Sequence, residues 1–249
     1  YDEEIRYLTT LDKQLFQQFS FIVNGINEQE IQLGLKILNS CQFLNNISTN
    51  QRGATLQEFV SNTGNLDVIG GEQVQKYGIE GIKGKIDSKV VNNNKAFIKP
   101  NSILVQRIVS HIMNPIDHIA ITASIPENQN LILVDTINQI ELEKKIKPEC
   151  IWALLHSKLV NWYVYLFVFA KAIRTMQFDN PTTSKIPIPK GITNKKQQPF
   201  IKLVREILAE KKANPQADTS GLEEEIVFLV YELYGITEQE EIKLIEGHP

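Results

Sequence analysis

The sequence has 249 residues, 42% of them hydrophobic and 22% charged, so it can bury a core and form one or two ordinary globular domains. A formal net charge of −3 by itself argues against a nucleic-acid partner, and the two distant cysteines, Cys41 and Cys150, exclude a disulfide framework and a paired-cysteine metal motif. We therefore expect a protein of a reducing compartment, the cytoplasm.

The chain begins YDEEIRYLTT, without an initiator Met and without the basic start and apolar core of a signal peptide. We therefore expect a fragment of a larger protein. Residues 1–47 form a mixed segment, in which EQEIQLGLKILNSCQFL is the best candidate for a helix.

A β-rich lobe is predicted over residues 48–147. Seven glycines lie between residues 53 and 84, separated and followed by short alternating or β-branched runs such as LDVIG, KAFI, SILVQRIVSHI and HIAITASI. Short strands joined by glycine-containing turns explain this pattern, because glycine adopts backbone angles that tight turns require.

After Pro148 the pattern becomes helical to the end of the chain. The first helix is predicted over residues 149–176. Its longest uncharged apolar run, LVNWYVYLFVFA, has 12 residues, against the roughly 20 that a bilayer-spanning helix needs, so we expect a buried helix and no membrane. The segment SKIPIP follows, where two prolines impose an extended conformation.

A second helix, over residues 197–213, should form a hairpin with the first, and capped tail helices should follow. One of these begins near Thr219 or Ser220 and stops at Gly235, and a shorter one follows it. The predicted fold class is thus α+β: an irregular β-rich specificity lobe, then a C-terminal helical hairpin and tail helices over residues 148–249.

Charge is partitioned along the chain. From Lys76 to Arg107 there are seven basic residues against two acidic ones, and from His156 to Lys212 eleven against three. The stretch from Thr219 to Pro249 has eight Glu and a single Lys. A basic middle with an acidic end suits a protein that presents one face to a polyanion, although scattered lysines on a solvated surface would give the same counts.

No catalytic motif is found. There is no glycine-rich nucleotide fingerprint, and Gly70-Gly71 indicates only a turn. His111 and His118 lack partners at metal-ligand spacing, so a core or surface role is favoured. The triplet Asp87-Ser88-Lys89 resembles half of a nuclease site but lacks the upstream Pro-Asp. We expect no catalytic and no metal-binding residues.

Several segments resemble one family. The run ALLHSKLVNWYVYLF followed by SKIPIP, and the ending EEEIVFLVYELYGITEQEEIKLIEG, resemble the C-terminal target-recognition domain, a Taq-like specificity domain, of Type II adenine-N6 DNA methyltransferases and fused restriction-modification enzymes. GGEQVQKYGI and NNNKAFIKPNSILVQRI resemble strand segments of the same domains. The likeness covers roughly residues 50–249, and the first 45 residues match nothing in that family.

The resemblance implies that catalysis belongs to a separate N-terminal domain of the same parent chain. That domain would bind S-adenosylmethionine and the flipped adenine and would contain Asn-Pro-Pro-Tyr or Asn-Pro-Pro-Phe. Here Asn-Pro occurs at 114, 180 and 214, followed each time by another residue. The fragment is therefore expected to need no cofactor, to be no enzyme itself, and to be joined through residues 1–47 to a catalytic methyltransferase domain.

The expected partner is double-stranded DNA. Phosphate contacts come from Lys and Arg, and base edges are read by Arg, Asn, Gln, Ser and Thr. The candidate DNA-binding residues are Lys76, Tyr77, Lys83, Lys85, Lys89, Asn93, Lys95, Lys99, Arg107, Lys171, Arg174 and Lys185. Arg174 is the candidate for reading a base, and Tyr77 could stack on DNA or belong to the core.

Two other classes remain open. One is an active nuclease or methyltransferase, which the missing motifs disfavour for this fragment. The other is a protein-interaction or assembly module of a multi-subunit restriction-modification system, for which the acidic tail helices are suited. A basic β lobe favours DNA recognition, because an adaptor does not require one.

Overall fold

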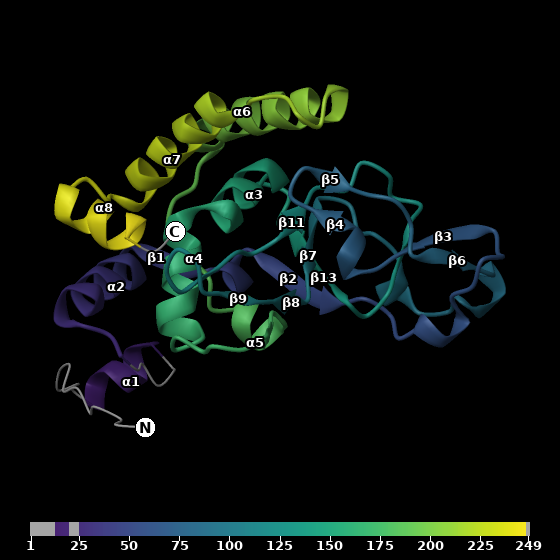
Figure 1. Ribbon diagram of the computed structural model, residues 1–249, viewed down its shortest axis with the longest axis horizontal. Coiled ribbons are helices and arrows are strands. Elements are labelled where there is room, and N and C mark those ends of the chain that lie inside the picture. The colour runs from purple at the N-terminus through teal and green to yellow at the C-terminus, as the bar shows by residue number, and fades with distance from the viewer. Residues whose placement is uncertain (1–12, 20–24, 248–249) are drawn as a thin grey trace.

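The computed structural model describes residues 13–19 and 25–247, which fold as the α+β chain predicted from the sequence (Figure 1). The α-helices of this part of the chain are α1 (Lys13–Phe19), α2 (Glu28–Ser40), α3 (Pro148–His156), α4 (Lys158–Tyr163), α5 (Asn180–Thr183), α6 (Asn194–Ala213), α7 (Ser220–Tyr234) and α8 (Gln239–Glu246). The strands are β1 (Cys41–Phe43), β2 (Ser48–Arg52), β3 (Leu66–Ile69), β4 (Val74–Gln75), β5 (Gly78–Ile79), β6 (Gly84–Ile86), β7 (Ser102–Gln106), β8 (Ile108–Val109), β9 (His111–Ile112), β10 (His118–Ile119), β11 (Ala123–Ser124), β12 (Ile132–Leu133), β13 (Ile137–Leu142), β14 (Met176–Gln177) and β15 (Pro187–Pro189).

A four-stranded antiparallel sheet, in the order β11-β7-β13-β2, lies at the centre of the molecule. Side chains of a strand alternate between the two faces of its sheet. Ile103 and Val105 of β7 join the large core with the helices, while Leu104 between them joins a separate core under the smaller sheet. β7 is therefore buried on both faces, which explains its run of apolar residues.

The smaller sheet has the order β12-β3-β6 and projects from one end of the molecule (Figure 1). It has its own core around Val68, Ile86 and Ile132. Because its strands have two to four residues each and the segments between them contain short 3-10 turns, the expectation of short, irregular strands is confirmed.

The helix predicted over residues 149–176 is wrong in its continuity and its end. Ser157 is extended and its hydroxyl accepts a hydrogen bond from the Val160 N–H, so that it ends α3 and caps α4. A π-helical turn, Val164–Val168, follows, and Ala170 and Lys171 then take left-handed conformations (φ 50° and 55°) that end the helix. Met176 is already in a strand.

The two prolines of SKIPIP have the predicted extended conformation. Pro187–Pro189 is β15, which pairs antiparallel with β1 and is buried throughout. The proline pair therefore ties the chain back to its N-terminal segment. The apolar helix before it packs against α2, where a Cβ on Gly34 would lie 2.3 Å from the Phe167 ring. The close approach requires glycine.

The helical end is an antiparallel pair, α6 and α7, with α8 beyond it (Figure 1). The predicted hairpin partners meet, since α3 packs on α6. Thr193 caps α6, and Gly235 at φ +69° ends α7 as predicted. No helix in the described ranges is long and apolar enough to cross a bilayer.

Candidate nucleic-acid interface

The predicted DNA-binding lysines of the β-rich lobe have two different environments. Lys83, Lys89 and Lys95 are exposed and form no ion pair with any described residue. Lys85 instead pairs with Asp67, its Nζ lying 2.8 Å from Oδ1. The Asn93 side chain is also in use, since its Oδ1 accepts a hydrogen bond from the Lys95 N–H (3.0 Å).

Lys76 and Tyr77 contact the helical end of the molecule. Lys76 Nζ lies 2.6 Å from Glu223 Oε2, and the Tyr77 hydroxyl donates to Glu223 Oε1 (2.8 Å). Lys211 lies over the Tyr77 ring, and the Trp152 indole N–H donates to the Lys76 carbonyl. Partial burial would raise the pKa of Glu223, but the hydrogen bonds from Lys76 and Tyr77 lower it below its usual value. The β4–β5 turn is thus anchored to the start of α7.

The remaining predicted residues surround the central sheet. Arg107 Nε donates to Asp179 (3.1 Å to Oδ1), and its two Nη groups have no hydrogen-bond partner in the described ranges. The backbone N–H of Lys99 donates a hydrogen bond to the buried Gln139 side chain, which fixes the position of Lys99. Lys171 pairs with Glu30 (3.6 Å).

Lys185 lies 5.2 Å from the centre of the Phe43 ring, a cation–π contact. Arg174 is exposed and has no ion pair among the described residues. Lys83 and Arg107 are the two predicted residues that the fold brings together in a recess.

A recess of about 290 Å³ lies where the smaller sheet meets the central sheet. Four hydrogen-bonding side chains reach it from separate segments: Gln73 after β3, Lys83 before β6, Arg107 after β7, and Thr136 before β13. Ile108, 42% exposed, adds an apolar contact at its edge. We call this the junction recess.

The glycine pair Gly70-Gly71 shapes the junction recess. The Gly71 N–H donates to Thr136 Oγ1 (2.9 Å), and a Cβ on Gly71 would lie 2.8 Å from the Thr136 carbonyl oxygen. The Gly70 N–H donates to Gln73 Oε1 (3.0 Å), which leaves the Gln73 amide N–H groups available. The two glycines therefore let the turn approach Thr136 and present Gln73.

Donors predominate in the junction recess. Lys83 Nζ and the Arg107 Nη groups carry positive charge, and the Gln73 amide and Thr136 hydroxyl can donate as well. Glu72 is the acidic residue at its edge. This set of groups fits a phosphate oxygen or the acceptor atoms of a base edge.

An ion pair beside the recess holds the turn that contains Thr136. Arg52 pairs with Asp135, and Gln57 Nε2 donates to Asp135 Oδ1 (3.0 Å). Partial burial would raise the pKa of Asp135, but the hydrogen bonds from Gln57 and Arg52 lower it below its usual value. The carboxylate therefore stays ionised and the turn stays fixed at neutral pH.

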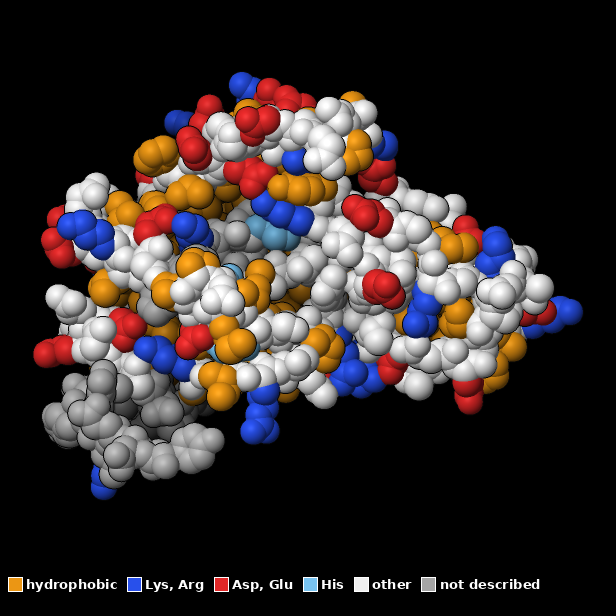
Figure 2. Space-filling model, in the orientation of Figure 1, with side chains coloured by type: hydrophobic (Ala, Val, Ile, Leu, Met, Phe, Trp, Pro, Cys, Tyr) orange, Lys and Arg blue, Asp and Glu red, His pale blue; other side chains and the backbone are white. Residues whose placement is uncertain are grey.

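Exposed apolar residues continue from the recess along the next strands. β8 pairs with β14, so Ile108 lies opposite Gln177, and the β9–β10 hairpin follows β8 with Met113 69% exposed at its turn. Ile173, 75% exposed, precedes Arg174 in the chain. Figure 2 shows hydrophobic side chains gathered over this region and basic ones below it.

The described residues contain no group of three or more side chains suited to hold a metal ion. Burial and the Lys76 charge lower the pKa of His156 to about 3, so it is a neutral, partly buried residue that accepts from the Ala123 N–H. Burial raises the pKa of Cys41 to about 11 and of Cys150 to about 12, which makes both thiols unreactive.

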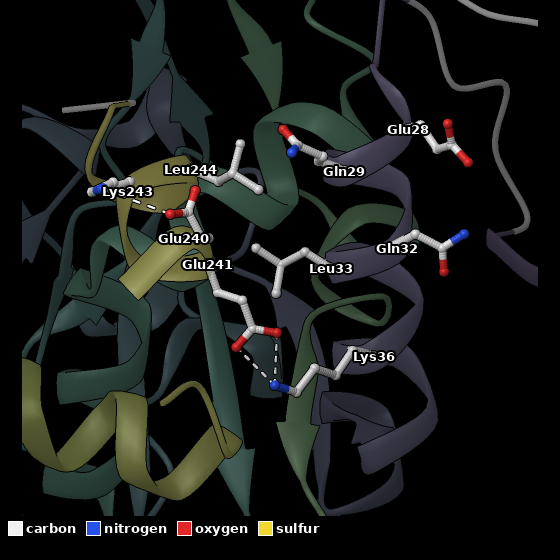
Figure 3. Close-up of a pocket in the computed structure, with 9 residues that line it drawn as sticks. All are labelled: Glu28, Gln29, Gln32, Leu33, Lys36, Glu240, Glu241, Lys243 and Leu244. Atoms are coloured by element: carbon white, nitrogen blue, oxygen red, sulfur yellow. Dashed lines mark hydrogen bonds and ion pairs between the residues drawn. The ribbon is translucent and has the colours of Figure 1, made fainter. Parts of the chain in front are cut away.

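A second recess, of about 620 Å³, lies between α2 and α8 (Figure 3). Leu33 and Leu244 face it, and Lys36 bridges to Glu241 at one end, with both contacts at 2.7 Å. Its charged lining residues are Glu28, Lys36, Glu240, Glu241 and Lys243.

Comparison with known proteins finds no match to a protein-family model and none to a curated protein sequence. Among solved structures, one similar chain comes from work on complex assembly and conformational transition of the type I R-M system; it has 10% identity and a TM-score of 0.41, with 88% of this chain and 52% of that one covered. Another is the HsdS subunit from Thermoanaerobacter tengcongensis, at 11% identity and TM-score 0.39, with coverage of 84% and 52%. The chain spans about half the length of these solved chains.

Sequence reasoning missed Gln73 and Thr136. Gly70-Gly71 was interpreted only as a turn, although Gln73 follows it directly and turn amides commonly bond to such a side chain. Thr136 lies more than 60 residues away in the sequence, and no local pattern marks it.

Proposed function

We propose that this chain recognises double-stranded DNA as the target-recognition part of a restriction-modification enzyme. The observation that carries the proposal is the junction recess, where Lys83, Arg107, Gln73 and Thr136 converge from four segments on an exposed surface. Two positively charged side chains together with neutral amide and hydroxyl donors form the combination that DNA-binding proteins use to contact phosphates and base edges.

Three features support the assignment of the surrounding surface to DNA. Lys83, Lys89 and Lys95 have no carboxylate partner in the described residues, so their charges are available to phosphates. The exposed Met113 and Ile173 offer apolar contacts of the kind that DNA-bending proteins insert between base steps. Arg174 is exposed next to Ile173.

The finer proposal concerns the parent protein. A Type II adenine-N6 methyltransferase, with or without a fused nuclease, would supply S-adenosylmethionine binding and base flipping from a catalytic domain outside these residues. The chain itself would then need no cofactor, and it should neither methylate nor cut DNA. Turnover by the pure chain with S-adenosylmethionine, or with Mg²⁺ and plasmid, would contradict this.

The test is duplex binding measured by fluorescence anisotropy between 20 and 200 mM salt. Each phosphate contact adds about 0.9 to the negative slope of log affinity against log salt, so replacing Lys83, Lys89 and Lys95 with Gln should reduce the slope by up to about 2.7. The matched control replaces Lys195, Lys196 and Lys202, which are exposed on α6 and change the net charge equally. Equal losses in both variants would reject the proposed surface.

A further inference from the structure

One aromatic side chain on the helical end is almost wholly in solvent. Phe228 lies in the middle of α7 and is 74% exposed. In a helix its side-chain neighbours are three and four residues away, here Glu224, Glu225, Tyr231 and Glu232. The three glutamates are exposed and form no ion pair with any described residue. Three glutamates that form no ion pair with a described residue therefore flank Phe228, and Lys202 lines the same surface from α6.

Three other glutamates of this end form ion pairs with distant lysines. Glu223 pairs with Lys76, Glu241 with Lys36, and Glu246 with Lys158 (2.6 Å). The acidic tail is thus bonded to the rest of the molecule at three points. Glu224, Glu225 and Glu232, beside Phe228, form no such ion pair with a described residue.

Phe228 stands between two grooves. One, of about 470 Å³ between α7 and α8, is lined by Val227, Tyr231, Ile236 and Ile242. The other, of about 360 Å³ between α6 and α7, is lined by Pro199, Leu203 and Leu229. Figure 2 shows hydrophobic, acidic and basic side chains interleaved along the helical end of the molecule. Phe228, its three glutamates and the two grooves are here called the Phe228 face.

We propose that the Phe228 face binds a basic amphipathic helix of a partner protein. Helices dock in hydrophobic grooves through apolar residues at three-to-four spacing, and grooves on both sides of one Phe provide that geometry. Lysines or arginines flanking those residues would meet Glu224, Glu225 and Glu232, which gives the interface complementary charge. Lys202, at the edge of one groove, is the cation that such a helix would displace or avoid.

Charge disfavours the other occupants. Glu224, Glu225 and Glu232 outnumber Lys202, the one lysine among the described residues that line the two grooves, and so disfavour DNA and anionic lipid surfaces. A second copy docking by the same face would put the two sets of glutamates against each other, because a two-fold interface pairs a patch with itself. A basic amphipathic helix fits both the apolar grooves and the negative charge beside them.

The experiment uses the whole chain and a labelled 18-residue helical peptide with Leu at three-to-four spacing and Lys elsewhere; the reference peptide replaces every Lys with Glu. The Leu/Lys peptide should bind and the Leu/Glu peptide should not. Phe228→Ser should weaken binding at least tenfold, and replacing Glu224, Glu225 and Glu232 with Gln should weaken it and flatten its salt dependence.

Two matched controls decide whether the binding is specific. Phe59→Ser removes a 45% exposed Phe from the β-rich lobe, and replacing Glu72, Glu80 and Asp87 with Gln, Gln and Asn makes the same charge change there. Neither should alter peptide affinity. If either control weakens binding as much as its counterpart, or if both peptides bind equally, the proposal is overturned.

Sedimentation of the chain alone tests whether a second copy of the chain occupies the Phe228 face. A dimer that Phe228→Ser abolishes would assign the face to a second copy and overturn the proposal. Duplex binding by the Phe228→Ser variant should equal that of the unmodified chain. Failure of DNA recognition and failure of peptide docking are therefore separate outcomes.

Discussion

The β-rich lobe and the helical end use charge in opposite ways. In the lobe, Lys83, Lys89 and Lys95 have no acidic partner among the described residues, so positive charge remains at the surface. At the helical end, Glu223, Glu241 and Glu246 each neutralise a lysine from a distant segment. The charge partition along the sequence thus has two origins: a surface available to a ligand, and contacts that hold the fold together.

The difference also separates lysines that look alike in the sequence. Lys76 and Lys83 both lie in the basic stretch, yet Lys76 is bound to Glu223 and to the Tyr77 and Trp152 rings, whereas Lys83 lies in the junction recess. A variant of Lys76 should affect stability first, and a variant of Lys83 should affect binding first.

The largest expected effect is at the glycine pair of the junction recess. Gly71→Val should lower the free energy of unfolding by about 3 kcal/mol, since the new side chain meets the Thr136 backbone. Chemical denaturation checks this. Gly78→Val is the control, because a Cβ there meets no atom within 4 Å. Equal losses at both positions would show that Gly71 is not specially placed.

Acid should destabilise the helical side of the core through His156. The unfolded chain takes up this proton below about pH 6.5, whereas the native state, with its pKa lowered to about 3, does not. The free energy of unfolding should therefore fall by about 2 kcal/mol between pH 7 and pH 5 from this residue alone.

Denaturation at both pH values tests this in the unmodified chain and in His156→Gln, which cannot take up the proton. The variant should show a correspondingly smaller difference between the two pH values. If the free energy of unfolding changes equally between pH 7 and pH 5 in both proteins, His156 takes up its proton in the native state as it does in the unfolded chain.

The contact between lobe and helical end should depend on Glu223. Glu223→Gln should cost about 1–2 kcal/mol of stability, because it removes the charge from bonds to Lys76 and Tyr77. Since the native pKa of Glu223 is lowered, its contribution is present above the unfolded pKa and is lost as the pH falls through the native value. Thermal unfolding of Glu224→Gln, an exposed neighbour, should differ little from the unmodified chain.

The smallest effect distinguishes two neighbouring lysines. Lys83→Gln should weaken duplex affinity about fivefold to tenfold at 0.1 M salt, as one lost phosphate contact would. Lys85→Gln should have less effect on affinity, because its charge is partly neutralised by Asp67, and should cost under about 1 kcal/mol of stability. A larger loss of affinity from Lys85 would place the DNA elsewhere on the lobe.

Local patterns predicted much of the fold. The change at Pro148, the helix ending at Gly235 and the extended SKIPIP segment each depend on nearby residues and were correct. The break at Ser157 was missed, since the apolar pattern continues through it. It is stabilised by Asn161, whose amide donates to the Leu155 and Ser157 carbonyls and whose oxygen accepts from Ile121.

The candidate site was less accessible to sequence reasoning. Composition identified the basic stretch, but which lysines are available depends on carboxylates far along the chain, such as Glu223, 147 residues from Lys76. The junction recess combines four segments, and of its residues only Lys83 and Arg107 were among those predicted to bind DNA. Such convergence is a product of tertiary packing, which local patterns do not encode.

The central claim is that the junction recess reads DNA, and selection from a randomised duplex library tests it most directly. The unmodified chain should enrich one sequence motif. Gln73→Ala should relax the preference at one or two positions, at a cost of about 1–3 kcal/mol per position, while the Lys195, Lys196 and Lys202 variant should select the same motif. No enrichment, or the same motif with unchanged preference from Gln73→Ala, would contradict the account.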